Sequence, residues 1–164
     1  MTYLKNTKLQ NYIHNVDTNF TSQAITGYGS KSNATAFDGT EVTYTPATNA
    51  SKVVYEISFQ TAWNPDVNHS ICSFRLEYED PNTSVWTDIP GTQGFIGTVA
   101  IYADSEWSTY TFRCILDTWT GSRKIRANAP AWSVGTQYTL GRSYNANNST
   151  GVGSCPHVSI YSIM

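Results

Sequence analysis

The stretch that decides the fold is residues 52–60, KVVYEISFQ, in which side-chain chemistry alternates with a period of two. One set of alternate positions is entirely apolar: Val53, Tyr55, Ile57 and Phe59. The other set is mostly polar and includes Glu56, Ser58 and Gln60. Successive side chains of a β-strand point to opposite faces of a sheet, so this pattern predicts a strand with one face in the core and one in solvent.

The same alternation returns in later stretches. It predicts strands near residues 72–79, 95–102, 110–116, 138–142 and 158–163, with residues 24–28 and 42–44 as further candidates. Turn residues separate them, as in DPNT at residues 80–83. We therefore expect an all-β domain of about eight strands, folded as an antiparallel two-sheet sandwich or a barrel.

Composition agrees with this fold class. Of the 164 residues 40% are hydrophobic and only 13% are charged, about half the charged share of an average globular protein. The net charge of −2 attracts no polyanion over long range, so we expect no nucleic-acid partner. The one basic cluster, Arg123, Lys124 and Arg126, follows a Gly-Ser turn and is interpreted as a solvated loop. No apolar run is long enough to span a bilayer and no signal-peptide pattern opens the chain, so we expect neither a membrane partner nor secretion.

The first forty residues differ from the rest. Residues 1–20 mix Lys, Asn and Thr with scattered apolar side chains, so we interpret residues 1–40 as an extended docking arm with the first strand or strands, and residues 41–164 as the sandwich. A short helix is the alternative, because four apolar residues from Leu9 to Val16 follow helical spacing. The residues expected to make the contacts of the arm are Tyr3, Leu4, Leu9, Tyr12 and Ile13.

Candidate catalytic residues are sparse. The histidines His14, His69 and His157 lie in three separate regions and are interpreted as surface polar residues. The one dense acidic group, at residues 77–80, is interpreted as a solvated strand edge, since a glycosidase would need a second carboxylate from elsewhere at a set separation. We therefore predict no catalytic residues and no enzymatic activity.

Metal ligands are also sparse. The cysteines Cys72, Cys114 and Cys155 match no metal-ligand spacing, and the first two fall in phase with apolar strand positions, which predicts burial. Residues 64–68, NPDVN, place oxygen ligands at alternate positions as a calcium loop would, but no glutamate follows at the required spacing. We expect neither a metal nor a cofactor.

Five tryptophans are the most informative large residues, and most follow or precede turns. Loop aromatics at the end of a β-sandwich stack on sugar rings or anchor protein interfaces, and Trp63 and Trp119 are the candidates for such a ligand contact. The alternative is that these side chains plug the ends of the sandwich.

From residue 52 onward the sequence resembles a group of small virion proteins of tailed phages, particularly phages of aquatic bacteria. The resemblance is carried by residues 53–63, 74–78, 138–144 and 156–163. The final Pro-x-Val-x-Ile pattern after an aromatic strand and a loop is also similar to the trimeric jelly rolls of the C1q and tumour-necrosis-factor type.

The resemblance implies a jelly-roll sandwich that forms homotrimers on a phage particle. The function it implies is that of a capsid decoration (cement) protein, which binds the major capsid protein or another virion protein and stabilises the shell. A receptor- or carbohydrate-binding tip domain of a tail or head fibre, with a surface glycan as its partner, is the alternative. The C-terminal strand, apolar on both faces, should be central in a sheet or buried at a subunit contact. The residues expected near the trimer axis are Val158, Ile160, Tyr161 and Ile163.

Overall fold

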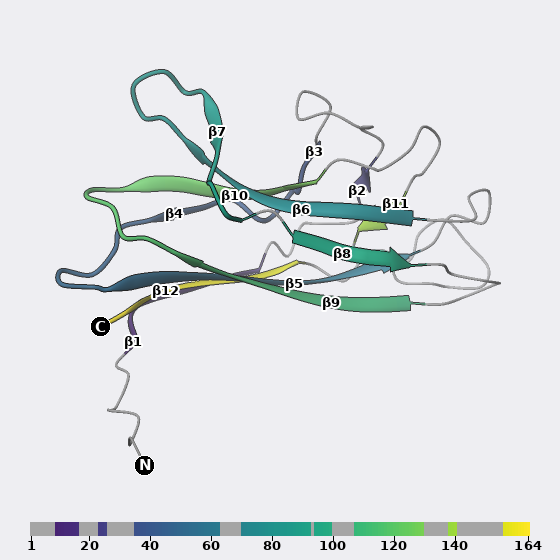
Figure 1. The fold of residues 1–164 in the computed structure, drawn as a ribbon, viewed down its shortest axis with the longest axis horizontal. Helices are drawn as coiled ribbons and strands as arrows, with labels where there is room; N and C mark the ends of the chain where they lie inside the picture. Colours follow the sequence, from purple (N-terminus) through teal and green to yellow (C-terminus); the bar gives the residue numbers. More distant parts are fainter. Residues whose placement is uncertain are drawn as a thin grey trace, which may run out of the picture.

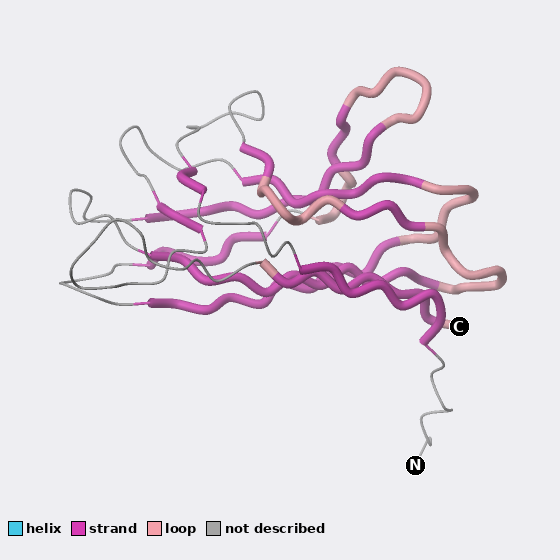
Figure 2. The backbone as a smooth tube through the Cα atoms, turned by 180° about the vertical axis from the view of Figure 1, so that it is seen from behind, coloured by secondary structure: helices cyan, strands magenta, loops and turns pink. Residues whose placement is uncertain are grey.

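The chain folds as two antiparallel β-sheets packed face to face (Figure 1, Figure 2). The computed structural model describes residues 9–16, 23–25, 35–62, 70–92, 94–99, 107–129, 138–140 and 156–164. Within these ranges every regular element is a strand, and none is a helix. The predicted all-β, antiparallel two-sheet sandwich is confirmed.

The first sheet is built on the longest strand, β5 (Lys52–Ala62). β9 (Trp107–Leu116) pairs with one edge of β5, and β12 (His157–Ile163) pairs with the other. β1 (Leu9–Val16) pairs with β12, while β11 (Tyr138–Leu140) pairs with the end of β5 and with β2 (Gln23–Ile25). The C-terminal strand therefore lies between β1 and β5, as its apolar residues on both faces predicted.

The second sheet is built on β10 (Arg123–Ala129) and β6 (Ser70–Glu79). β3 (Thr35–Ala36) and β4 (Val42–Tyr44) pair with β10, whereas β7 (Trp86–Asp88) and β8 (Gly94–Val99) pair with β6. The interpretation of residues 123–126 as a solvated loop is wrong. The basic side chains of β10 mask its period, because Ile125 is its only large apolar residue.

Residues 9–16 are a strand rather than a helix or a free arm. The register with β12 pairs Gln10 with Ser162 and then Ile13 with Ile160, so β1 carries one extra residue. Asn11 lies in this bulge with a φ of 52°, a left-handed conformation that Asn tolerates well. The bulge interrupts the period of two, which is why the spacing of the apolar residues looked helical.

The core lies between the two sheets and contains the apolar set predicted from residues 52–60. The inner face of β12 adds Val158, Ile160 and Ser162, none of which is exposed. The Ser162 hydroxyl joins the second sheet to the first, because Tyr44 Oη lies 2.7 Å from Ser162 Oγ and the Ala47 amide donates to the same oxygen at 2.9 Å. One buried hydroxyl thus links β12 to β4 and to the segment that follows β4.

Replacing this hydroxyl tests its contribution to the fold. Ser162→Ala leaves two buried polar groups without their partner, so we expect the free energy of unfolding to fall by about 1–3 kcal/mol. Ser159→Ala, on the opposite face of the same strand, should change it by less than about 0.5 kcal/mol. Urea denaturation followed by tryptophan fluorescence measures both; equal losses in the two variants would contradict the assignment.

Candidate functional site

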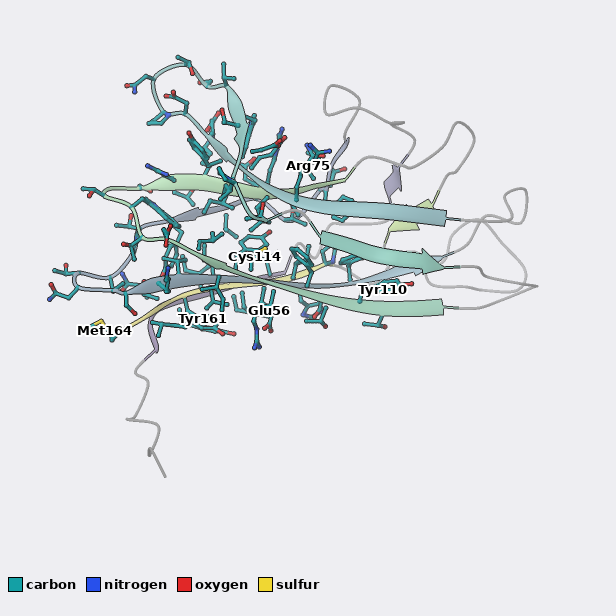
Figure 3. All side chains as sticks on the ribbon, viewed as in Figure 1. Glu56, Arg75, Tyr110, Cys114, Tyr161 and Met164 are labelled. Carbon is teal, nitrogen blue, oxygen red and sulfur yellow. The ribbon has the colours of Figure 1, made fainter. Side chains whose placement is uncertain are left out.

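The outer face of the first sheet carries a row of apolar side chains, one from each of four strands. Tyr161 of β12 lies opposite Val54 of β5, which lies opposite Ile115 of β9. Tyr12 of β1 completes the row by stacking on Tyr161, with ring centroids 5.8 Å apart. Ile115 is 66% exposed and Tyr12 is 56% exposed. We call these four residues the apolar row. Figure 3 shows Tyr161 on the outer side of this sheet, whereas Cys114 points between the sheets.

Val54 and Ile115 were not among the residues predicted to form an interface or a ligand site. Both stand beside a core residue, in the doublets Val53-Val54 and Ile115-Leu116, so both occupy positions where the alternation predicts a polar side chain. An apolar residue out of phase in two neighbouring strands is the signal that could have located the row. The register that aligns them across the sheet is not visible in the sequence.

A polar row runs beside the apolar row on the same face. Ser159 Oγ lies 3.0 Å from His14 Nδ1 and 3.1 Å from Tyr12 Oη. The row continues with Glu56, which accepts a hydrogen bond from Arg113 Nε at 2.6 Å and raises the pKa of that guanidinium. The residues of the polar row thus bond one another, and the Glu56 carboxylate is paired with Arg113.

The pairing of β1 with β12 brings two of the histidines together, although the sequence places them far apart. The imidazole centroids of His14 and His157 are 5.6 Å apart, and both residues are exposed. A hydroxyl beside an imidazole resembles a nucleophile and its base, but such a pair needs a third group that orients the base. Among the described residues no carboxylate bonds His14, and Ser159 lies on an open sheet surface. The described residues therefore do not supply the third group that such a pair needs.

The outer face of the second sheet is ionic. Arg126 of β10 pairs with Glu77 of β6 through Nε at 3.2 Å and Nη2 at 3.1 Å. The guanidinium also lies over the Trp86 ring, 3.8 Å from its centroid. On either side, Lys124 contacts Glu79 at 2.9 Å and Arg75 contacts Asp88 at 3.3 Å. We call this surface the ionic face, and its charges are largely matched within the chain.

The interpretation of residues 77–80 as a solvated edge is wrong for Glu77. This residue is only 4% exposed, because Arg126 and the neighbouring strands cover it. Asp117, in the turn after β9, has a side chain that is 91% exposed, and the Lys52 ammonium at 2.6 Å lowers its pKa. A general acid needs a raised pKa, so Asp117 is tuned in the wrong direction.

Trp119 packs against the core instead of standing free in a loop. Its ring meets Tyr44 edge to face with centroids 6.0 Å apart. It also lines a pocket of about 300 Å³ at the edge of the sandwich, together with Arg123 and Tyr78. Trp119 therefore closes the sandwich and borders a cavity, while Trp63 lies outside the described residues.

The predicted interface residues fall on different surfaces. Val158 and Ile160 point into the core and are fully buried within one chain, so they cannot form a subunit contact in this fold. Tyr161 and Ile163 lie on the outer face, where a second subunit could reach them. From the arm, Leu9 and Ile13 lie in β1, and Ile13 is 39% exposed. Tyr3 and Leu4 lie outside the described residues.

Cys114 is buried, as predicted, and burial raises its pKa to about 11, so it is a thiol at neutral pH. The side chains of Cys72 and Cys155 and the loop at residues 64–68 lie outside the part of the chain for which side chains are described. Within that part, no three His, Cys, Asp or Glu residues gather as metal ligands would. The described ranges also include no helix that is long and apolar enough to cross a bilayer.

Comparison with known proteins adds no relative. No protein-family model matches the chain, and no curated protein is significantly similar to it.

Neutralising Glu77 should destabilise the fold, whereas neutralising Asp117 should not. Glu77→Gln leaves Arg126 without its buried counter-charge, so we expect a loss of about 2–4 kcal/mol in the free energy of unfolding. Asp117→Asn removes only an exposed pair and should leave the urea midpoint within experimental error. Equal midpoints for the two variants would show that the ionic face is not structural.

Proposed function

We propose that this protein is a non-enzymatic structural protein that assembles into homotrimers through the outer face of its first sheet. The observation that carries the proposal is the apolar row, which a single chain leaves exposed at Ile115 and Tyr12. Burying an isoleucine side chain stabilises by about 1.5–3 kcal/mol, so burying the exposed two thirds of Ile115 contributes about 1–2 kcal/mol per subunit. A closed cyclic assembly repeats that gain at every interface.

The contrast between the two outer faces supports this choice of surface. Interface centres are depleted in charge and enriched in aromatic residues, which describes the apolar row with its stacked Tyr12 and Tyr161. The ionic face has little to gain from a partner, because Arg126, Lys124 and Arg75 already have carboxylate partners. The apolar row is also flanked by matched polar groups, the Arg113–Glu56 pair among them, which suits the rim of an interface.

The strand order supports the jelly-roll form of the sandwich. One sheet has the order β1-β12-β5-β9, and the other places β10 and β6 side by side with β4 and β8 on their outer edges. The chain changes sheet between β4 and β5, between β5 and β6, and again on each side of β9. Changes of sheet of this kind between nested antiparallel strands are what two interlocked Greek keys require.

Within this class, a capsid decoration protein of a phage particle is the role that fits best. The resemblance to small virion proteins supports it, and so does a low-charge face suited to permanent contacts. A trimer that binds only the assembled shell stabilises that shell by mass action. Docking on the major capsid protein or another virion protein would fall to residues 1–8, which include Tyr3, Leu4, Lys5 and Lys8. These residues directly precede β1, the strand that completes the first sheet.

The alternative is a receptor- or carbohydrate-binding tip domain. The observation that favours it is the pocket beside Trp119, since aromatic residues beside a cavity stack on sugar rings. Trp119→Ala would abolish glycan binding under this alternative. Glycan-array binding by the wild-type chain, without binding to phage heads, would select it over decoration.

The trimer is tested by placing a charge at Ile115, which is more exposed than Tyr12 of the same apolar row. Ile115→Asp should convert the trimer to monomers, because the carboxylate would lose its hydration at the interface. Val85→Asp is the matched control, since Val85 is 57% exposed and lies in the turn beside β7 on the second sheet. Sedimentation equilibrium at about 50 µM gives the masses. A monomeric wild type, or an unchanged mass for Ile115→Asp, would overturn the proposal.

The docking role of residues 1–8 is tested by removing them while keeping β1. The truncated chain should remain trimeric and lose binding to empty heads of tailed phages in co-sedimentation. Replacing only Lys5 and Lys8 by Gln separates charge from apolar contact. Full binding by the truncated trimer would place the capsid contact elsewhere, and a wild-type trimer that binds no head would exclude decoration.

A further inference from the structure

A pocket of about 300 Å³ opens between the two sheets at the β9 edge of the sandwich. Its apolar wall comes from both sheets and from the segment after β7: Ile89, Pro90, Leu116 and Ile125. Tyr78, Trp119 and Arg123 complete it, with Asp117 and Thr118 from the turn after β9 and Ile115 at the end of that strand. The volume is at the lower end of the range for small-molecule sites.

Arg123 differs from the other arginines that the structure describes. Arg75, Arg113 and Arg126 each bond a carboxylate, at distances between 2.5 and 3.3 Å. Arg123 has no carboxylate within ion-pair distance in the described ranges. Its guanidinium carbon lies 5.0 Å from the Tyr78 ring centroid and 5.7 Å from that of Trp119. Two aromatic rings thus orient a cation at the pocket, and no acceptor among the described residues bonds its N–H donors.

Trp119 supplies a second donor without an acceptor. Its Nε1 is buried and has no hydrogen-bond partner among the residues that the structure describes. A buried N–H without an acceptor costs about 1–3 kcal/mol, so an acceptor that reached it would recover that cost. The indole must turn slightly for a ligand atom to meet Nε1, because this atom is out of reach of solvent in the present conformation.

We propose that this pocket binds a small organic carboxylate, with the carboxylate on Arg123 and Trp119 Nε1 and an apolar body against Ile89, Leu116 and Ile125. The Arg123 guanidinium and Trp119 Nε1 are both donors, so the ligand group between them must be an acceptor. A planar carboxylate matches a guanidinium in shape and in charge. This site goes beyond the assembly function proposed above and does not depend on it.

The charge balance selects a carboxylate over a phosphate. Arg123 is one positive charge, and Lys124 points to the ionic face, where it is bound to Glu79. Asp117 adds a negative charge to the pocket lining, although Lys52 pairs with it at 2.6 Å. The single positive charge of Arg123 balances the charge of a monoanion, whereas a dianion would keep one unbalanced negative charge close to Asp117.

The test follows the indole N–H signal of Trp119 by NMR on the full chain, with Trp119→Phe used to assign it. The probes are hexanoate and glucuronate, and glucose and 1-hexanol are their uncharged counterparts. We expect a saturable shift of the Trp119 signal with at least one acid and none with its uncharged counterpart. The acid that binds identifies the body of the ligand as a hydrocarbon chain or a sugar ring.

Arg123→Gln should weaken this binding about tenfold or more, because it removes the charged donor. Lys124→Gln, the adjacent residue on the opposite face of β10, should leave the affinity unchanged. If Arg123→Gln does not fold, the comparison of each acid with its uncharged counterpart on the wild-type chain decides the question. No shift with either acid up to about 20 mM, an equal shift with sodium chloride at matched ionic strength, or wild-type affinity in Arg123→Gln would each overturn the proposal. Tyr12→Asp serves as a second control, because Tyr12 belongs to the apolar row and does not line the pocket, so loss of trimers with retained carboxylate binding separates the two sites.

Discussion

The pairing of the C-terminal strand with β5 is the constraint on which the rest of the structure depends. The seven residues of β12 pair with β5 from Ser58 to Lys52, joining parts of the chain about a hundred residues apart. This pairing gives β1 the edge on which it forms, since β1 has no other partner in the described ranges. It also places Ser162 where Tyr44 and Ala47 can bond its hydroxyl. The closing of the first sheet and its attachment to the second therefore depend on one strand.

The period of two lets that strand serve two purposes without conflict. Its inward positions, Val158, Ile160 and Ser162, are fully buried, whereas Ser159 and Tyr161 on the other side are only partly buried. Side chains on opposite faces of a strand do not touch, so the outer set can change without creating a cavity in the core. An interface can thus evolve on the outer face while the core stays fixed. The exposure of Tyr12 and Ile115 beside a fully buried core is consistent with that separation.

The sequence predicted the strands whose inner faces alternate cleanly and missed those in which charge or a bulge hides the period. β5 and β9 combine strong alternation with large apolar residues, so their strands and core residues could be assigned from the sequence. β10 has one large apolar residue, so its sequence does not look like a strand. The reason for its basic residues is visible only in the fold, where Glu77 and Glu79 of the neighbouring strand β6 pair with them. β1 has its period shifted at Asn11. The approach of His14 to His157 depends on a register between strands that are about 140 residues apart, and no local pattern encodes it.

The difference between the two outer faces carries the functional argument. Both sheets must shield one face from water, and the sandwich does this with the inner faces. On the second sheet the remaining face is largely neutralised within the chain by Arg126, Lys124 and their carboxylates, so a partner would have to desolvate these pairs with little in return. On the first sheet the register instead aligns four apolar residues, of which Ile115 and Tyr12 remain largely exposed on the outer face. Burying the apolar row of the first sheet would release free energy, whereas burying the ionic face of the second sheet would not. Assembly should therefore proceed through the face that contains β12.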